Sequence, residues 1–205
     1  MTVIIDYGVG NLFSLNSSLA CIGQSSKVSG DPQVIASADR IILPGVGAFG
    51  DAAGKLREKG LDSLILRLAE QGKPLLGICL GMQLLFDKSY EFGETDGLGL
   101  IPGQVKSIEP AIPKDYKIPH IGWNTLHLTE KGRSSPIYKY TGEGDFVYFV
   151  HSFAAMDCED SLTAQAEYGA MLTASVEREN VFGVQFHPEK SGETGLKILK
   201  AFCEI

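Results

Sequence analysis

The sequence predicts an α/β fold, a single domain whose open mixed sheet is flanked by helices. In the first half of the chain, short β-rich runs alternate with amphipathic stretches, which is typical of parallel crossover units. In the second half, shorter runs are broken by proline and glycine, which indicates antiparallel or mixed strands. The 205 residues, 44% of them hydrophobic, suffice for one sizeable core. We therefore expect one domain over residues 1–205.

The first half is expected to form an open, doubly wound sheet. Apolar residues recur at helical spacing over residues 52–71, at Leu56, Leu61, Leu64 and Leu68, between two runs of strand length. Alternating strands and helices are most simply joined by parallel crossover connections. The expected elements, in order, are strand 2–7, helix 11–22, strand 37–43 ending at Pro44, helix 52–71, strand 75–78 and helix 82–86.

The second half is expected to add the antiparallel part of the sheet. Its β-rich runs are short, and the proline-containing stretch 109–119 is the best candidate for an irregular loop. The expected strands are residues 105–108, 121–128, 146–153, 161–168, 170–176 and 181–186, and the last helix is residues 193–202.

Charge and composition exclude several classes of partner. The net charge is −7 and the basic residues are scattered, so nothing indicates a nucleic-acid or anionic-membrane surface, and a small soluble partner is expected. The longest apolar runs are far shorter than the roughly 20 residues of a membrane span, and a strand stands where a signal segment would begin. Four cysteines without zinc-type spacing predict reduced thiols in a cytoplasmic protein, with neither disulfides nor a structural metal.

An apolar strand leads directly into a cysteine flanked by glycines, within residues 74–83 (PLLGICLGMQ). This layout is typical of a nucleophile elbow, a sharp strand-to-helix turn that exposes the nucleophile at the carboxyl end of a sheet. Taken alone, a cysteine at a strand end, such as Cys79, is more often a buried small hydrophobic residue than a nucleophile. Gly77 and Gly81 favour the functional interpretation, because a strained turn needs residues without a Cβ and regular elements do not.

A second predicted strand leads to His187, which is followed by Pro188 and Glu189. Residues two apart in an extended segment project to the same side, so Glu189 can accept a hydrogen bond from the imidazole of His187. Each residue alone has an ordinary explanation, as a strand end or a solvated helix cap. Together with Cys79 they form a nucleophile, a base and an orienting carboxylate, which predicts covalent acyl transfer.

Two glycine-rich turns follow predicted strands. Residues 44–47 (PGVG) end a parallel strand on the same sheet edge as Cys79, and their amides can line an oxyanion hole. Residues 6–11 (DYGVGN) lack the ending of a P-loop and the full dinucleotide fingerprint, so we interpret them as a tight turn. The remaining histidines are interpreted as structural or secondary: His120, His127 and His151.

The motifs at residues 77–83 (GICLGMQ) and 186–189 (FHPE) resemble those of the triad-type, class I glutamine amidotransferases, which have a flavodoxin-like α/β fold. Within that superfamily, the resemblance extends over nearly the whole chain to the glutaminase subunits of imidazole glycerol phosphate synthases. The PGVG turn discriminates most sharply, and Phe153 is a departure, because many relatives carry tyrosine there. The further matching segments are residues 6–11, 44–47, 119–124 (PHIGWN), 148–152 (YFVHS) and 187–191 (HPEKS).

The resemblance implies a glutaminase. The Cys79 thiolate attacks the side-chain amide of glutamine, and His187, held by Glu189, passes its proton to ammonia and then activates water. The backbone amides of Leu80 and Val46 are implied as the oxyanion hole, and no metal or organic cofactor is implied. The positions that would hold glutamine are Gly47, Gln83, Ser152 and Phe153, the last two through their backbone.

The ammonia needs an acceptor, and the chain is too short to include a (β/α)₈ barrel. The resemblance implies a heterodimer with the cyclase subunit of imidazole glycerol phosphate synthase, which makes imidazole glycerol phosphate and an aminoimidazole carboxamide ribotide in histidine biosynthesis. Glycines on both sides of Val46 lower the cost of a peptide flip, so we hypothesise that its amide points away from the site until the partner binds substrate, and that Gly45→Pro tests this. The implied interface residues are Asn11, Trp123, Tyr148 and Lys190, of which the two aromatics are equally compatible with a core position.

Two alternatives remain open from the sequence. A related amidotransferase subunit would keep the chemistry of Cys79 and deliver ammonia to a different synthase, and its partner-facing residues would differ. A flavodoxin-like binding or regulatory module with a vestigial elbow would carry a Cys79 no more reactive than Cys21 or Cys203.

Overall fold

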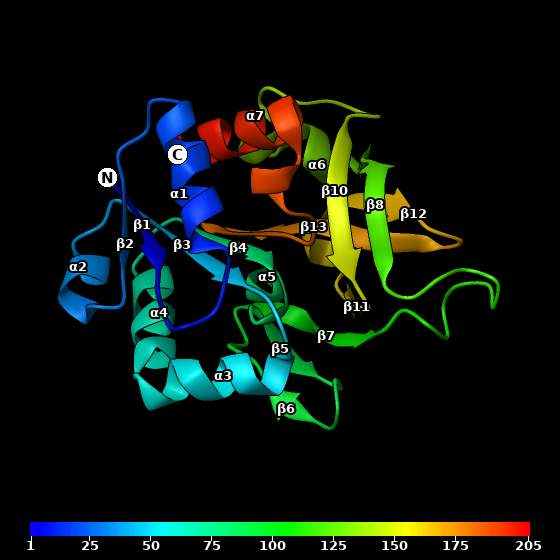
Figure 1. Ribbon diagram of the computed structural model, residues 1–205, viewed down its shortest axis with the longest axis horizontal. Helices are drawn as coiled ribbons and strands as arrows, with labels where there is room; N and C mark the ends of the chain where they lie inside the picture. Colours follow the sequence, from blue (N-terminus) through cyan, green and yellow to red (C-terminus); the bar gives the residue numbers. More distant parts are fainter.

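A computed structural model describes residues 1–205 and shows a central mixed sheet with helices on both faces (Figure 1). Five neighbouring strands are parallel, and three antiparallel strands continue the sheet, so the predicted α/β class with an open mixed sheet is confirmed. In spatial order the strands are β2 (Ser26–Ser29), β1 (Thr2–Ile5), β3 (Arg40–Gly45), β4 (Leu75–Cys79), β14 (Val181–Val184), β13 (Met171–Arg178), β12 (Leu162–Glu167) and β9 (His127–Leu128).

Two cores lie on opposite faces of this sheet. Successive side chains of a strand point to opposite faces, so Val3 and Ile5 of β1 join one core, whereas Ile4 joins the other. The first core lies under α3 (Phe49–Glu58) and α4 (Leu61–Glu70), with α2 (Pro32–Ala36) beside α4. The second lies under α1 (Leu12–Cys21) and α7 (Gly192–Cys203). No helix combines the length and the apolar character that a bilayer crossing requires.

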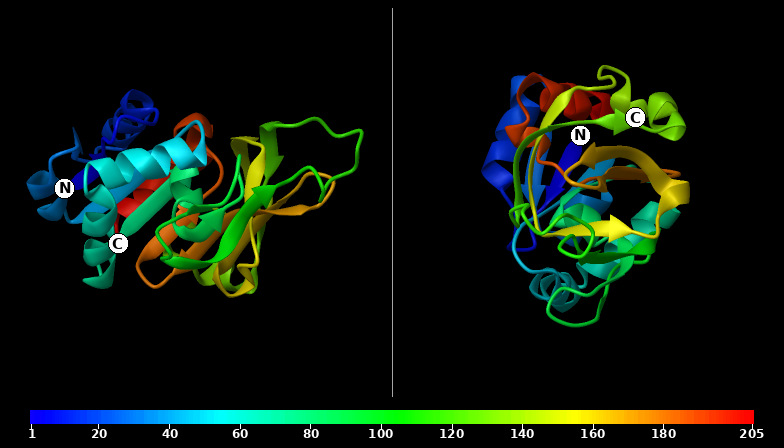
Figure 2. Two further views of the ribbon diagram at one scale, coloured as in Figure 1. Left: turned by 90° about the horizontal axis from the view of Figure 1, so that it is seen from below. Right: turned by 90° about the vertical axis from the view of Figure 1, so that its right-hand side faces the viewer.

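Residues 86–156 add two smaller sheets. Figure 2 shows these strands at the end of the molecule away from α2, with the loop 109–119 extending beyond them, and this loop is irregular as predicted. One sheet pairs β10 (Phe146–His151) with β8 (His120–Thr125), and the other has the order β11 (Phe153–Met156), β7 (Ile101–Ser107), β5 (Phe86–Ser89) and β6 (Thr95–Asp96). The short helices are α5 (Leu80–Gln83) and α6 (Glu130–Ser134), with 3-10 turns at Pro136–Tyr138, Glu159–Ser161 and Pro188–Lys190.

Several predicted boundaries are wrong. The helix predicted over 82–86 ends at Gln83, and Phe86 begins β5, because a short, continuously buried run fits a helix or a strand equally well. The helix predicted over 52–71 is two helices, separated at Gly60, whose φ of 64° cannot continue a helix. Neither β2 nor α2 was predicted, because β2 is a four-residue edge strand with a single apolar side chain and α2 is only five residues long.

Two predicted strands are each divided by the change from one sheet to another. Residues 121–128 become β8 and β9, which belong to different sheets, and residues 146–153 become β10 and β11, separated at Ser152. Apolar residues stand on both sides of each division, so composition alone did not locate it. In residues 121–128 the division coincides with a change in the phase of the apolar positions, from Ile121 and Trp123 to Leu126 and Leu128.

Candidate active site

Cys79 ends β4 and begins the turn into α5. Its backbone has a φ of 55° and a ψ of −113°, a conformation that residues with a side chain rarely adopt. A Cβ at Gly81 would collide with the carbonyl oxygen of Leu43, and a Cβ at Gly77 would lie 2.6 Å from the carbonyl oxygen of Gly81. The two glycines therefore allow α5 to pack against β3 and β4, and this packing holds Cys79 in its strained turn, as the elbow prediction requires.

His187 follows β14, and Glu189 lies in the 3-10 turn that begins at Pro188. The Nδ1 atom of His187 lies 2.8 Å from Oε1 of Glu189, and both side chains are only 3% exposed. Burial alone would lower the pKa of His187, but its hydrogen bonding with Cys79 and Glu189, and the charges of both, raise the pKa to about 9. The site therefore favours an imidazolium next to the Cys79 sulfur, as an activated cysteine requires.

Strand β10 is fastened to the segment that carries His187. The backbone N–H of His187 donates to the carbonyl oxygen of Tyr148 at 2.9 Å. Ser191 Oγ accepts a hydrogen bond from the backbone N–H of Tyr148 at 2.9 Å and donates one to the carbonyl oxygen of His187 at 2.6 Å. These three bonds fix β10 beside the catalytic candidate His187.

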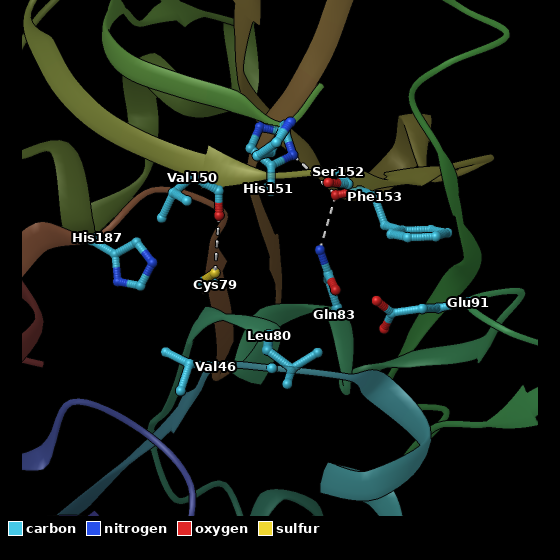
Figure 3. Close-up of a pocket in the computed structure, with 12 residues that line it drawn as sticks. Val46, Cys79, Leu80, Gln83, Glu91, Val150, His151, Ser152, Phe153 and His187 are labelled. Carbon is cyan, nitrogen blue, oxygen red and sulfur yellow. Dashed lines mark hydrogen bonds between the residues drawn. The ribbon is translucent and has the colours of Figure 1, made fainter. Parts of the chain in front are cut away.

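A pocket of about 280 Å³ opens beside Cys79 (Figure 3). The thiol of Cys79 points at the carbonyl oxygen of Val150 in β10, with 3.9 Å between sulfur and oxygen. Glu189 contacts His187 from outside this pocket. All other predicted catalytic, oxyanion and substrate residues line it: Val46, Gly47, Cys79, Leu80, Gln83, Ser152, Phe153 and His187.

A model of the family described as "Glutamine amidotransferase class-I" matches residues 3–205. The chain belongs to this family. It is 46% identical to the "Imidazole glycerol phosphate synthase subunit HisH" of Wolinella succinogenes, over the full length of both chains. It is 49% identical to the subunit of the same name from Aquifex aeolicus, covering 98% of this chain and 95% of that one.

Solved structures of lower sequence identity share the fold. "PurLQS from Thermotoga maritima" has a TM-score of 0.77 at 23% identity and covers 99% of this chain and 97% of its own. The glutaminase domain of Trypanosoma brucei CTPS with bound acivicin has a TM-score of 0.67 at 16% identity, with 99% and 93% coverage. At these identities the likeness shows the fold alone.

The glycine-rich turn of this amidotransferase follows β3, and the parallel register pairs Gly45 directly with Cys79. The hydroxyl of Tyr7 donates to the carbonyl oxygen of Pro44 at 2.8 Å. Burial, and after it the nearby charge of Cys79, raises the pKa of Tyr7 above its usual value, so this hydroxyl keeps its proton. The start of the turn is therefore fixed at the sheet edge that carries the nucleophile.

The end of the turn is less constrained than its start. Val46 is 44% exposed, and Gly47 has a φ of 90° with open space around it. A Cβ at Gly45, by contrast, would lie 2.7 Å from the backbone nitrogen of Gly81. The substitution Gly45→Pro would therefore disturb the elbow itself, and it cannot isolate a flip of the Val46 peptide.

Two polar side chains of the amidotransferase pocket were not singled out as site residues from the sequence, and the apolar residues Pro119 and Val150 also line it. Glu91 lines the pocket from the turn between β5 and β6, and its Oε2 accepts a hydrogen bond from the backbone N–H of Phe49 at 2.6 Å. The residues around Glu91 have the mostly polar composition of an ordinary exposed turn, so the local sequence does not indicate a site. His151, interpreted as structural, also lines the pocket, and it donates from Nδ1 to the carbonyl oxygen of Phe153 at 2.9 Å.

The predicted interface residues surround the segment that carries the catalytic candidates. Trp123 is 55% exposed, which rules out the core alternative for this residue, and its ring lies 5.9 Å from that of half-buried Tyr148. The ammonium of Lys190 lies 5.9 Å from the centre of the Tyr148 ring. Asn11 lines a small separate pocket with Glu189, whose Oε2 is buried without a hydrogen-bond partner.

Proposed function

We propose that this chain is the glutaminase subunit of imidazole glycerol phosphate synthase, with residues 1–205 forming one amidotransferase domain. It hydrolyses glutamine to glutamate and ammonia. The ammonia passes to a cyclase subunit that makes imidazole glycerol phosphate and an aminoimidazole carboxamide ribotide in histidine biosynthesis. The observation that carries the proposal is the buried pair of His187 and Glu189 beside a strained Cys79 at one pocket. The full-length relatives named as this subunit support the choice of partner.

Acylation proceeds from the form in which the thiol proton of Cys79 has passed to Nε2 of His187, which is the imidazolium that the site favours. The sulfur attacks the side-chain amide carbon of glutamine, so a C–S bond forms and the carbonyl becomes an oxyanion. When the oxyanion collapses, the C–N bond breaks, and His187 gives its proton to the nitrogen, which leaves as ammonia. Glu189 accepts the hydrogen bond from Nδ1 of His187, which directs Nε2 to the sulfur and stabilises the imidazolium.

Deacylation uses the same base on water. His187 takes a proton from water as the oxygen attacks the γ-glutamyl thioester, a C–O bond forms, and the C–S bond breaks. The proton then returns to the sulfur of Cys79 as glutamate leaves. Positioned proton transfer of this kind contributes about 10²- to 10⁴-fold to the rate.

The backbone amides of Leu80 and Val46 are proposed as the oxyanion donors. Leu80 is the first residue of α5, directly after the nucleophile, and Val46 lies in the turn that pairs with the elbow. A donor that meets the developing oxyanion is worth about 3 kcal/mol of transition-state stabilisation.

The pocket presents hydrogen-bond acceptors at the end where the amino-acid portion of glutamine would lie. The amide nitrogen of Gln83 already donates to the backbone carbonyl oxygen of Phe153 and to the side-chain oxygen Oε1 of Gln185, both at 2.9 Å, so only the Gln83 oxygen remains for substrate. Figure 3 shows that oxygen on the side of Glu91. We assign Glu91 and Gln83 to the α-ammonium group of glutamine, with Gly47 and the backbone of Ser152 as further contacts.

The directions of these hydrogen bonds refine the predicted role of the Phe153 backbone in binding glutamine. The carbonyl oxygen of Phe153 accepts from both Gln83 and His151, so both of its lone pairs are used. In the proposed site this carbonyl orients Gln83, and it does not contact glutamine.

The surface proposed for the cyclase subunit is the outer face of the β8–β10 pair. Trp123 and Tyr148 are register partners there, so their side chains lie on one face. An apolar patch of this kind is typical of a protein interface. Because Tyr148 is also bonded to the His187 segment, this face is adjacent to the catalytic base. The exposed apolar side chains of the patch are Ile121, Trp123 and Phe146, and the other proposed contacts are Asn11, Tyr148 and Lys190.

The proposal also assigns a compartment. Cys21 is exposed and unpaired, and the other three thiols are free as well. Free thiols suit a reducing compartment, so we place the protein in the cytoplasm, where the proposed pathway would supply its partner.

The test is glutamate release from glutamine by the purified chain, alone and with the cyclase subunit and its nucleotide substrate. We expect strong stimulation by the loaded cyclase and complete loss of activity in Cys79→Ala. Activity that depends on Cys79 but ignores the cyclase would refute the partner and favour another amidotransferase system. No release under any condition, with Cys79 alkylated no faster than exposed Cys21, would refute the glutaminase.

A further inference from the structure

Gln185 lies two residues before His187, in the segment that follows β14, and no step of the hydrolysis described above involves it. Both of these side chains reach Cys79. The amide nitrogen Nε2 of Gln185 lies 3.7 Å from Sγ of Cys79. The residue is 0% exposed, and its backbone N–H donates to the carbonyl oxygen of Ala174 at 2.8 Å. Its amide is therefore held against the sulfur.

The orientation of this amide follows from a backbone group that can only accept. The carbonyl oxygen of Phe153 has no proton, so the group of Gln83 that faces it at 2.9 Å must be the NH₂. The second N–H of Gln83 then donates to Oε1 of Gln185, also at 2.9 Å. With its oxygen bound in this way, Gln185 can present only its NH₂ to the sulfur.

The Phe153 carbonyl is itself fixed by a pair of buried histidines. His151 donates to it from Nδ1 at 2.9 Å, and His151 Nε2 lies 3.0 Å from Nδ1 of His120. Burial lowers the pKa of His151 to about 3 and that of His120 to about 4, so both rings are neutral at pH 7. A neutral imidazole has one donor and one acceptor nitrogen, so His120 donates to His151 and His151 donates to the carbonyl. In the series of hydrogen bonds that connects His120, His151, the Phe153 carbonyl, Gln83, Gln185 and the sulfur of Cys79, the donor and the acceptor of each bond are therefore defined.

We propose that Gln185 is a further catalytic residue of this enzyme, which donates a hydrogen bond to the sulfur of Cys79 and stabilises its thiolate. Gln83 has a second role as a positioning residue, because it holds the Gln185 amide with its NH₂ toward the sulfur of Cys79. The thiolate is both the attacking group and the group released on deacylation, so the same N–H serves both half-reactions. This inference rests on the proposed function, because it takes Cys79 as the nucleophile.

The test is the pH dependence of iodoacetamide alkylation at Cys79, followed by mass spectrometry of the peptide that contains it. Alkylation requires thiolate but not glutamine, so it separates thiolate stabilisation from substrate binding. The variant Gln185→Met removes the donor at similar volume, and Gln165→Met is the matched control in β12. A hydrogen bond to a charged group is worth at least about tenfold, so we expect the midpoint of the profile to rise by about one pH unit in Gln185→Met. The control should titrate like the parent.

Thermal unfolding establishes that each variant is folded. If Gln185→Met does not fold, Gln83→Met takes its place, because loss of the Gln83 donor frees the Gln185 amide to turn its oxygen toward the sulfur. A midpoint that rises in the folded variant supports the inference, and a midpoint equal to that of the parent overturns it. Failure of the proposed function gives a different result: Cys79 of the parent itself would react no faster than exposed Cys21.

Discussion

The carboxylate of Glu189 is predicted to accelerate the reaction through its charge, and Glu189→Gln removes that charge while keeping an oxygen that accepts from His187. The shift in the pKa of His187 from 6.5 to about 9 corresponds to about 3.4 kcal/mol in favour of the imidazolium. Cys79 and Glu189 together outweigh the opposing effect of burial, which is the largest single cause, so their joint contribution exceeds this net value. If Glu189 supplies half of the net value or more, that is about 1.7 kcal/mol or more, its loss slows a step that forms the imidazolium by a factor of about 10 to 20 or more.

The assay is steady-state glutamate release in the presence of the cyclase subunit and its nucleotide substrate. We expect kcat to fall by this factor, with little change in KM, because Glu189 does not line the glutamine pocket. The control is Glu193→Gln, since the Glu193 side chain is 82% exposed and pairs only with Lys197. A Glu189→Gln enzyme with the kcat of the parent would refute the reasoning, because the buried charge would then contribute nothing to the transition state.

Three further predictions concern the pocket, the elbow and acid stability. Glu91→Gln should raise KM for glutamine about tenfold at nearly unchanged kcat in the same assay, because it removes the charge proposed to bind the α-ammonium. Gly81→Ala should abolish folding, whereas Gly54→Ala, with open space around it in α3, should raise the free energy of unfolding by about 0.5–1 kcal/mol; thermal unfolding measures both. The pKa values of His120 and His151 lie below 6.5 in the folded state, so the unfolded chain binds more protons in acid. The free energy of unfolding should therefore fall below pH 6.5, by up to about 1.4 kcal/mol per pH unit for each histidine, and His120→Phe should make this slope shallower in urea titrations.

The catalytic candidates could be predicted from the sequence because their signals are local. The elbow is a strand, a cysteine and two glycines within a few residues, and His187 and Glu189 are two residues apart. The predicted contact between His187 and Glu189 is present, but the predicted extended segment is wrong, because Glu189 lies in a 3-10 turn. Gln185 is likewise two residues from His187 in the sequence.

Glu91 could not be predicted, because its place in the pocket depends on a chain reversal after β5 and on a hydrogen bond to the distant start of α3. The direction of the Gln83 amide has the same origin. It is set by the carbonyl oxygen of Phe153, which is far away in the sequence, and by a second buried amide. A sequence can show that a glutamine is available at a site, but only the assembled network shows which end of its amide faces the substrate.

The assembly of the site depends on register as much as on the residues themselves. Parallel pairing places Gly45 beside Cys79, and Gly77 beside Gly183, so the ends of β3, β4 and β14 lie abreast. A Cβ at Gly183 would lie 2.7 Å from the side chain of Met82 in α5, so the absence of one leaves room for the helix that follows the nucleophile. Successive residues of a strand face opposite sides of the sheet. A shift of one residue in either pairing would therefore place side chains, in place of the glycines, against α5, and α5 could no longer pack there. The glycines of three separate strands, together with Gly81 of α5, therefore specify a single alignment, and that alignment brings His187 to the sulfur of Cys79.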